Sequence, residues 1–382
     1  MKIVKVVLTG GPGGGKTSVL NAIKNLAITE EGYKNIIKLG DKKIKLVTIS
    51  ETATELISSG ITPTEAERIY DFQDILFEIQ KSKEESSIKS LRFGYDADVI
   101  LFLYDRGLLD GMAYLDKKGE FEDIMASKDV KELDILDKYD LVLDLLSTAT
   151  CAPEKYGFES NEARFEDVEW AKSVDRKTSA AWVGHRNMKL FDSGVSLEEE
   201  VNNVIEYLKD YILNGSNIEK EEYFIENSPV SFSKYNDVNS RRINVVNTHI
   251  DFGIDNVVDT ILVKRTYRGY STYFLQFVTK GSEKARIIKD ERIDENTYKR
   301  LLTRYDIKNV EEKKELSFVE GKHLYKVSFY NDFTTLEVEK DLDNEEIIIP
   351  NDIKIIRKIR DFSEKSELSS KKVLKKDKNM LL

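Results

Sequence analysis

A glycine-rich loop near the start of the chain carries residues suited to binding phosphate. Residues 8–20 read LTGGPGGGKTSVL and match the pattern G-x-x-x-x-G-K-S/T, which ends at Lys16 and Thr17. Glycines let the backbone wrap closely around an anion, with successive amides pointing inwards. We expect Lys16 to reach the β- and γ-phosphates of a nucleotide and the Thr17 hydroxyl to bind Mg²⁺. The residues expected to hold the nucleotide are Gly10, Gly11, Gly13, Gly14, Gly15, Lys16, Thr17 and Ser18.

An acidic and a basic residue follow a second run that is apolar on both faces. Residues 99–104 read VILFLY, and Asp105 and Arg106 come directly after them. An acid at the carboxyl end of a strand beside the phosphate loop is suited to helping bind Mg²⁺, and Arg106 to clamping a substrate phosphate. Asp110 follows one turn later and could support either residue. The alternative is a strand-ending aspartate with a surface arginine, which the phosphate loop in the same domain disfavours.

Glu51 comes just after a strand that ends at Ile49, so we expect it on the same rim of the sheet. It could orient an acceptor hydroxyl, act as a base or hold a metal-bound water. It could equally begin a helix and interact with the helix dipole. The residues alone leave both possibilities open.

Residues 162–186 form a basic segment that is expected to be helical. Its basic residues are Arg164, Lys172, Arg176, Lys177, His185 and Arg186. Such a helix could close over the triphosphate and supply an arginine to it. Acidic residues are interleaved with the basic ones, so a solvated charged helix is the alternative.

The elements that must position these residues alternate along the first half of the chain. Apolar runs typical of strands lie at Ile3–Leu8, Ile44–Ile49, Val99–Tyr104, Leu141–Leu146 and Met188–Phe191. Helices are expected at Thr17–Asn25, Thr64–Ser90, Asp129–Lys138, Ala163–Ala181 and Leu197–Leu213. This alternation predicts an α/β domain with a mostly parallel sheet and helices on both faces.

The second half of the chain has a different pattern. Strand-like runs lie at Ile218–Ile225, Arg242–Ile250, Asn256–Tyr267, Thr272–Thr279, Lys284–Arg292, Lys314–Glu320, Lys322–Tyr330 and Thr334–Glu339. A helix is expected only at Glu295–Arg304 and in the tail, so this half predicts a mostly antiparallel β barrel. We therefore predict a nucleotide-binding domain over residues 1–213, a linker at 214–217, a β domain over 218–360 and a basic, mobile tail at 361–382.

Composition limits the class of protein. The chain has 382 residues with 40% hydrophobic and 34% charged side chains, which suits two or three globular domains. The chain has no run of about 18 apolar residues, so no membrane span is predicted. Its start also lacks a signal-peptide pattern. A single cysteine, Cys151, excludes an internal disulfide and indicates a cytoplasmic location. The net charge of −10 argues against sequence-independent binding to nucleic acid.

The first half resembles the P-loop kinase-like ATPases. The resemblance covers about residues 1–213 and is carried by TGGPGGGKT, ISETATELI, YDRGLLDGMAY and NEARFEDVEWAKSVDRKTSAAWVGH. This half of the chain is similar to the ribosylnicotinamide kinase module and to the P-loop domain of the TRPL translocation defect protein family. The resemblance implies that Asp105 and Arg106 match the Asp-Arg pair of these kinases and that Arg164 and Arg176 contact the nucleotide. Trp182 and His185 match a W-x-G-H signature without an assigned physical role.

Charges alternate along several strands of the second half. Glu219 and Glu221 share one face of a strand, as do Glu337 and Glu339, and paired acids of this kind suit a shared cation. The basic residues expected to bind an anion in this half are Lys264, Arg265, Arg268, Lys280 and Lys289. The alternative is the ordinary solvated face of a sheet; in a closed barrel, such charges would need an ionic ligand or each other.

This half resembles the CYTH domain, the triphosphate tunnel fold, over about residues 217–360. The opening strand of that family reads E-x-E-x-K, and Glu219 and Glu221 match it, but Tyr223 replaces the lysine. The resemblance implies that glutamates hold a divalent metal and that basic residues hold a polyphosphate. A tyrosine cannot supply the missing ammonium group, which argues against triphosphate hydrolysis and leaves anion binding open. The two-domain arrangement is that of the TRPL translocation defect family, which implies GTP binding and a phosphorylated lipid as a further ligand.

Together these patterns predict a Mg²⁺-dependent protein that binds ATP or GTP and acts as a phosphotransferase or nucleotide hydrolase. Its second domain is expected to bind a phosphorylated small molecule, a polyphosphate or a lipid head group. A nucleotide-dependent switch that binds a partner or phospholipid is the first alternative. A metal-dependent triphosphate hydrolase in the barrel is the second. The sequence does not choose between adenine and guanine.

Overall fold

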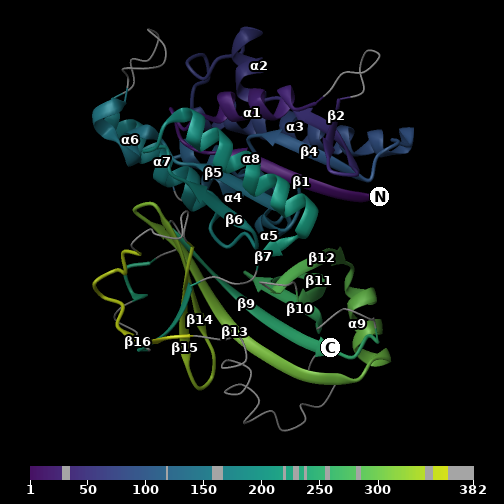
Figure 1. Ribbon diagram of the computed structural model, residues 1–382. Coiled ribbons are helices and arrows are strands. Elements are labelled where there is room, and N and C mark those ends of the chain that lie inside the picture. Colours follow the sequence, from purple (N-terminus) through teal and green to yellow (C-terminus); the bar gives the residue numbers. More distant parts are fainter. Residues whose placement is uncertain are drawn as a thin grey trace. The chain divides into compact units, whose positions relative to one another are not determined.

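The computed structural model describes residues 1–27, 35–117, 119–156, 167–217, 221–226, 232–235, 239–253, 259–280, 285–339 and 347–359. The chain divides into two compact units, Met1–Lys209 and Asp210–Leu382, and each is described by itself (Figure 1). The predicted domain boundary after residue 213 falls at the end of a helix, α8 (Leu197–Asn214). Among the predictions, Arg164, Glu219 and the tail at 361–382 lie outside the described residues.

The first unit contains a six-stranded sheet in the order β2-β3-β4-β1-β5-β6. The strands are β1 (Lys2–Thr9), β2 (Ile36–Leu39), β3 (Lys42–Ile49), β4 (Val99–Asp105), β5 (Leu141–Leu145) and β6 (Met188–Phe191). All neighbours are parallel except β2 and β3. The predicted α/β class is therefore confirmed. The edge strand β2 was not predicted, because its four residues are too short to show a pattern.

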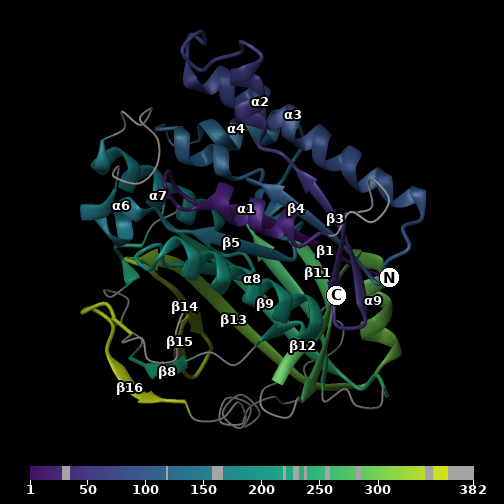
Figure 2. The ribbon, with the colours of Figure 1, turned by 45° about the horizontal axis from the view of Figure 1, so that its top comes forward.

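Helices lie on both sides of this sheet (Figure 2). They are α1 (Lys16–Asn25), α2 (Thr52–Ser58), α3 (Ile69–Lys89), α4 (Glu120–Ser127), α5 (Glu132–Leu136), α6 (Thr148–Cys151), α7 (Val168–Trp182) and α8. The helix predicted to start at Thr64 begins only at Ile69, because Thr62 and Glu65 close a local turn through their side chains. The helix predicted to start at Asp129 begins at Glu132, since Asp129 has a positive φ of 52°.

The order of the strands explains where the site must lie. β4 is buried along its length except at Asp105, as expected for a central strand with helices on both faces. β1 lies between β4 and β5, so the loop after β1 and the residues after β4 meet at one edge of the sheet. Ligands of open α/β sheets bind at the carboxyl ends of the strands.

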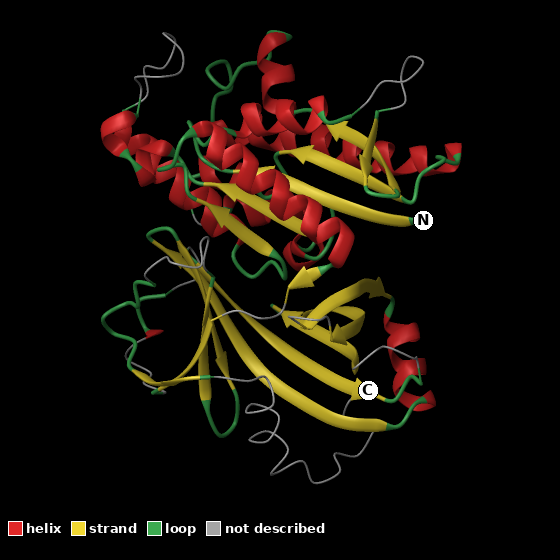
Figure 3. Ribbon diagram, viewed as in Figure 1, coloured by secondary structure: helices red, strands yellow, loops and turns green. Residues whose placement is uncertain are grey.

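The second unit is built on a ten-stranded sheet in which the neighbouring strands are antiparallel (Figure 3). The order is β16-β8-β15-β14-β13-β9-β10-β11-β12-β7, so among the described residues β16 and β7 are edges and a closed barrel is not shown. Its strands are β7 (Ser216–Asn217), β8 (Glu221–Ile225), β9 (Ser240–Ile250), β10 (Asp259–Tyr267), β11 (Tyr270–Lys280), β12 (Ala285–Ile293), β13 (Ile307–Glu320), β14 (His323–Phe329), β15 (Thr334–Val338) and β16 (Ile355–Lys358). One helix, α9 (Glu295–Arg304), follows β12.

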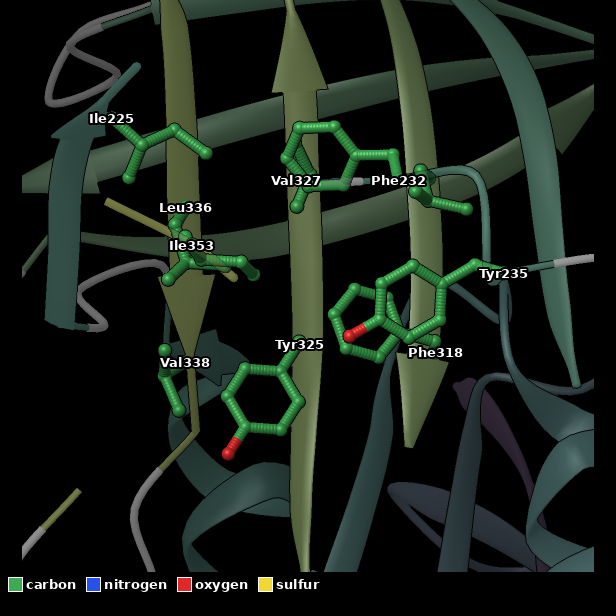
Figure 4. Packing of buried hydrophobic residues seen from close by; sticks show 10 residues of the cluster. Ile225, Phe232, Tyr235, Phe318, Tyr325, Val327, Leu336, Val338 and Ile353 are labelled. Carbon is green, nitrogen blue, oxygen red and sulfur yellow. The ribbon is translucent and has the colours of Figure 1, made fainter. Parts of the chain in front are cut away.

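Two apolar clusters form the core of the second unit. One joins β8, β13, β14 and β15 to the segments around Phe232 and Ile353, with Phe318 and Tyr235 stacked at 3.8 Å between ring centroids (Figure 4). The other packs α9 through Tyr298 and Leu302 against β9, β10 and β11. The predicted linker at 214–217 is structured, because β7 pairs there with β12.

Candidate functional site

The phosphate loop has the backbone that its glycines predict. Gly10, Gly13 and Gly15 have positive φ values of 134°, 80° and 66°, which other residues adopt only with strain. The loop also packs directly on β5, since a side chain at Gly10 or Gly14 would collide with the carbonyl oxygen of Leu145. The loop leads into α1, whose first residues are Lys16, Thr17 and Ser18.

Two partly buried cations converge on this loop. The Lys16 ammonium donates to the carbonyl oxygens of Gly10 and Gly11, each at 2.7 Å. Arg106 Nη1 reaches the same Gly10 oxygen at 3.4 Å. Burial and the neighbouring Arg106 guanidinium lower the pKa of Lys16 to about 8. An anion between the two cations would relieve their repulsion, and a phosphate would suit this position.

Arg106 is also paired with Glu51. Its Nε donates to Glu51 Oε1 at 2.5 Å, and the Thr54 hydroxyl donates to Glu51 Oε2 at 2.6 Å. Burial opposes ionisation of Glu51, but Arg106 and Thr54 outweigh it and hold the pKa of Glu51 below its usual range. Glu51 is at the same time the residue that precedes α2. Glu51 therefore lies at the start of α2 and contacts Arg106, and its role towards an acceptor stays a prediction.

Asp110 organises the turn that follows β4. Its carboxylate accepts from the Thr9 hydroxyl, from the Gly107 amide at 2.5 Å and from Trp182 Nε1 at 3.4 Å. Arg106 Nη1 lies 3.9 Å from the same carboxylate. Burial raises the pKa of Asp110, while Arg106 and these hydrogen bonds act in the opposite direction. Asp110 therefore contacts Arg106, one of the two residues that the sequence suggested it could support.

The W-x-G-H signature has a structural explanation. A side chain at Gly107 would collide with the Trp182 ring, so the turn and the indole fit closely. The ring of His185 lies within hydrogen-bond distance of the Tyr139 carbonyl oxygen, at 3.0 Å, and accepts from the Asn187 amide at 3.0 Å. Trp182 and His185 thus hold the end of α7 against the turn after β4 and the loop before β5.

Acidic residues behind the phosphate loop were missed in the sequence. Asp175 of α7 accepts from the amides of Gly11 at 3.0 Å and Ser147 at 2.9 Å. Glu200 of α8 lies close to Gly15, since its carboxylate would be 3.0 Å from a side chain there. Asp144 of β5 lies opposite Thr9 in the sheet. Burial is the main cause that raises the pKa of Asp144 and of Glu200 to about 8. The raised pKa favours the neutral form of each group and so reduces its repulsion of a bound phosphate.

The remaining predicted residues of the first unit lie as follows. Asp105 ends β4, and burial together with Glu51 raises its pKa. Thr17 is exposed at the start of α1. The oxygens of Asp105 and Thr17 are of the hard type that Mg²⁺ prefers, so this donor set fits the ion. Arg176 is exposed on α7, whereas its neighbour Asp175 faces the loop.

The predicted acids of the second unit do not share one face. Glu221 lies opposite Val338, whereas Glu337 lies opposite Glu222. Directly paired residues point to the same side of a sheet, so Glu221 and Glu337 point to opposite sides. Glu221 accepts from the Tyr223 hydroxyl at 2.6 Å and is paired with Lys358 at 2.9 Å. Across the described ranges, no group of three or more His, Cys, Asp or Glu residues is arranged to hold a metal ion.

The predicted basic residues are also divided between the two faces. Arg265 is paired with Val245, which in turn is paired with Lys313, so these side chains share a face that we call the polar face. Lys264 lies on the other face, opposite Tyr273. Arg268 and Lys289 are exposed, and Lys289 is paired with Glu291 at 2.7 Å. Lys280 ends β11, but its side chain lies outside what the structure describes.

The polar face carries charges that the sequence did not single out. Lys313 lies 3.0 Å from Glu315, and Lys326 lies 3.7 Å from Glu337 and 4.0 Å from Glu315. Arg265 is only 3% exposed. Burial opposes ionisation of Glu315, but Lys313, Lys326 and Arg265 outweigh it and lower its pKa to about 2. The charges on this face therefore form a mutually coupled group in which Arg265 and Glu315 are buried and the lysines are half-buried.

His249 makes further ionic contacts on the polar face. These contacts predict that the stability of the protein depends on pH. Its Nδ1 lies 2.5 Å from Asp259 and its Nε2 lies 4.0 Å from Glu311. Burial alone would lower its pKa, but the two carboxylates raise the pKa of His249 from 6.5 to about 9. Because the folded state holds the proton more tightly, this stabilisation is complete below about pH 6.5 and is lost as pH rises through about 9.

We expect the free energy of unfolding to fall by up to about 3 kcal/mol between pH 6.5 and 9.5 through this group. Hydrogen exchange of β9 and β10 in the wild type and in His249→Gln would measure it. The variant should be less stable at pH 6.5 and show a flatter pH profile, and Asp259→Asn should do the same. An unchanged profile in both variants would contradict the assignment.

Comparison with known proteins gives a family for the first unit. Residues 5–199 match the family model described as an AAA domain, while no curated protein matches the chain. Among solved structures, the chain is similar to the structure of PH1819 protein from Pyrococcus Horikoshii OT3. The identity is 12% over 40% of this chain and 84% of that chain, and the TM-score of 0.25 is too low to support an argument. No helix among the described residues has the length and apolar character needed to cross a membrane. Because the family model spans just over half of the 382 residues and includes the phosphate loop, the chain belongs to the AAA domain family.

Proposed function

We propose that the first unit binds a Mg²⁺ complex of ATP or GTP at the phosphate loop and transfers the γ-phosphoryl group to a small acceptor or to water. The observation that carries this proposal is the convergence of Lys16 and Arg106 on the Gly10 carbonyl oxygen. Two partly buried cations beside a glycine-rich loop at the start of a helix favour a polyanion. The family match supports nucleotide binding.

The roles of the residues follow from their chemistry. Lys16 would hold the β- and γ-phosphates, and Arg106 would neutralise charge on the transferred group. Thr17 and Asp105 would hold Mg²⁺, which would supply charge neutralisation across the phosphate oxygens. Glu51 orients Arg106 through the contact at 2.5 Å and is also available to an acceptor hydroxyl. Arg164 and Arg176 remain candidates for further contacts with the nucleotide.

The proposal is tested by calorimetric titration with MgATP and MgGTP in two buffers of different ionisation enthalpy at pH 8. Binding should be accompanied by proton uptake, because a bound polyphosphate raises the pKa of Lys16, which is about 8 in the free protein. Turnover is followed with γ-labelled nucleotides, with and without candidate acceptors. If folded protein shows neither binding heat nor turnover with either nucleotide, the proposal is wrong.

We further propose that the second unit is a CYTH-like domain that binds a phosphorylated ligand on its polar face, in a protein of the TRPL translocation defect type. The buried Arg265 and the half-buried Lys313 and Lys326 support this. The same observation keeps the nucleotide-dependent switch as a second candidate function, in which nucleotide binding alters ligand binding by this face. A cytoplasmic location stays a prediction from composition.

A matched pair of variants tests the polar face. Lys313 and Lys314 are neighbours on β13 whose side chains point to opposite sides of the sheet. In a Lys16→Ala background, Lys313→Met should weaken the binding of inorganic tripolyphosphate at least about tenfold, because one ion-pairing cation is lost. Lys314→Met should leave it unchanged. Calorimetry measures both, and Lys326→Met serves as a second variant. Equal affinity in all three variants would contradict this role.

A further inference from the structure

Arg106 has an unusual backbone for the residue that it is. Its φ is 69°, in the left-handed region that side chains other than glycine rarely adopt. A conformation of this kind persists only where the surrounding structure holds it. On one side, the Arg106 amide donates to the Leu8 carbonyl oxygen at 3.0 Å. On the other side, the Arg106 carbonyl oxygen accepts from Gln80 Nε2 at 3.1 Å. The turn after β4 is therefore held on its amide side by β1 and on its carbonyl side by Gln80 of α3.

Gln80 is itself held by a buried carboxylate. It is 5% exposed, and its Nε2 lies 3.4 Å from Oε1 of Glu84, one helical turn further along α3. The Glu84 carboxylate accepts from Lys138 at 2.5 Å and from the Tyr139 hydroxyl at 2.9 Å. With both amide protons of Gln80 directed to acceptors, its rotamer is determined.

The same network reaches the other end of the turn. The Tyr139 hydroxyl donates to Glu84 and accepts from the Leu108 amide at 3.2 Å. Gln80 thus holds the carbonyl of Arg106, and Tyr139 holds the amide two residues later. Gln80 and Tyr139 both contact Glu84. One buried network centred on this carboxylate therefore holds the backbone of residues 106–108 at both ends.

We propose that Gln80 is a positioning residue for the phosphate site. By holding the Arg106 carbonyl, it maintains the left-handed turn that directs the guanidinium to Glu51 and to the phosphate loop. Glu84 and Tyr139 act through Gln80 and Leu108 in the same way. This inference rests on the proposed function, because it assigns to Gln80 the orientation of the cation that would meet the transferred phosphate. Gln80 does not itself contact the substrate.

The chain offers a matched control on the same helix. Gln73 lies two turns before Gln80 on α3 and is 4% exposed, so it is equally buried. It packs against Gly111 in the short helix that follows the turn. Gln73→Leu and Gln80→Leu therefore remove the same chemical group from the same helix face, but only the second removes the contact to Arg106.

The test combines single-turnover kinetics with a double-mutant cycle. Gln80→Leu should lower the rate of γ-phosphoryl release from labelled MgATP or MgGTP about 10- to 100-fold, with the dissociation constant changed less than about threefold. Gln73→Leu should stay close to the wild type. In an Arg106→Ala background, Gln80→Leu should add no more than about a twofold effect, because its target is gone. An undiminished effect in that background, or no effect in the wild type, would overturn the inference.

A readout that is independent of turnover separates this inference from the proposed function. The Arg106 Nε proton, paired with Glu51, should give a protected NMR resonance that Gln80→Leu abolishes and Gln73→Leu retains. If this pattern is seen in a wild type that turns over no nucleotide, Gln80 positions Arg106 although the proposed chemistry is wrong. If the resonance survives in Gln80→Leu, the inference fails even where the nucleotide is turned over.

Discussion

Lys16→Ala should reduce nucleotide turnover by about 10³-fold. A loss of this size is typical when a donor to an anion that develops in the transition state is removed. Lys16 donates to the carbonyl oxygens of Gly10 and Gly11 and stands beside Arg106. Its removal leaves the polyphosphate with one partly buried cation in place of two. The effect is measured as binding of MgATP or MgGTP by calorimetry and as turnover of the labelled nucleotide.

The same substitution should have a different effect on the protein without nucleotide. Because burial and Arg106 lower the pKa of Lys16 to about 8, its charge is already disfavoured in the free protein. We therefore expect the thermal midpoint without ligand to stay the same or to rise, while the increase caused by Mg-nucleotide disappears. Lys24→Ala, an exposed lysine on the same helix, is the control. A Lys16→Ala protein that is still stabilised by nucleotide as strongly as the wild type would refute the assignment of the phosphate loop.

Arg106→Ala should lower turnover by about 10²- to 10³-fold and weaken nucleotide binding much less. The guanidinium is held 2.5 Å from Glu51 and 3.4 Å from the Gly10 carbonyl oxygen, so it is oriented before any ligand arrives. A cation placed in this way contributes most when charge develops on the transferred group. Arg106→Lys should recover only part of the rate, because an ammonium cannot replace the planar fork.

The loss of Arg106 also leaves Glu51 and Asp110 without their cationic partner, so stability must be checked beside activity. Arg186, whose Nε lies 3.6 Å from the buried carboxylate of Asp137, provides the control for removing a buried guanidinium. Arg186→Ala should cost stability and leave the single-turnover rate unchanged. If Arg106→Ala turned over nucleotide at the wild-type rate, Arg106 would have no part in the reaction and would only brace Glu51.

The amino-acid sequence alone was sufficient to predict the local features of the site. The phosphate loop, the strand before it and the helix after it depend on glycine conformations and short apolar runs, and all three lie within residues 2–25. The position of Asp105 and Arg106 could be predicted in the same way, because a run that is apolar on both faces identifies a central parallel strand. The antiparallel class of the second unit also follows from local patterns, since alternating runs and turns recur there.

Contacts between distant segments could not be predicted in this way. Asp175 and Gln80 look like ordinary polar residues of charged helices, and only the packing of α7 and α3 brings them to Gly11 and Arg106. The start of β13 was missed because its charged residues hide a strand whose polar face is buried.

The division between sequence and tertiary structure has one physical reason. Backbone conformation and strand or helix periodicity depend on neighbouring residues, so the sequence by itself determined the phosphate loop and the two classes of fold. Pairing register depends on which strands meet, and a shift of one residue reverses the face of every side chain. Only the tertiary structure could therefore decide that Glu221 and Glu337 point to opposite sides of the sheet, and that Arg265 shares a face with Lys313.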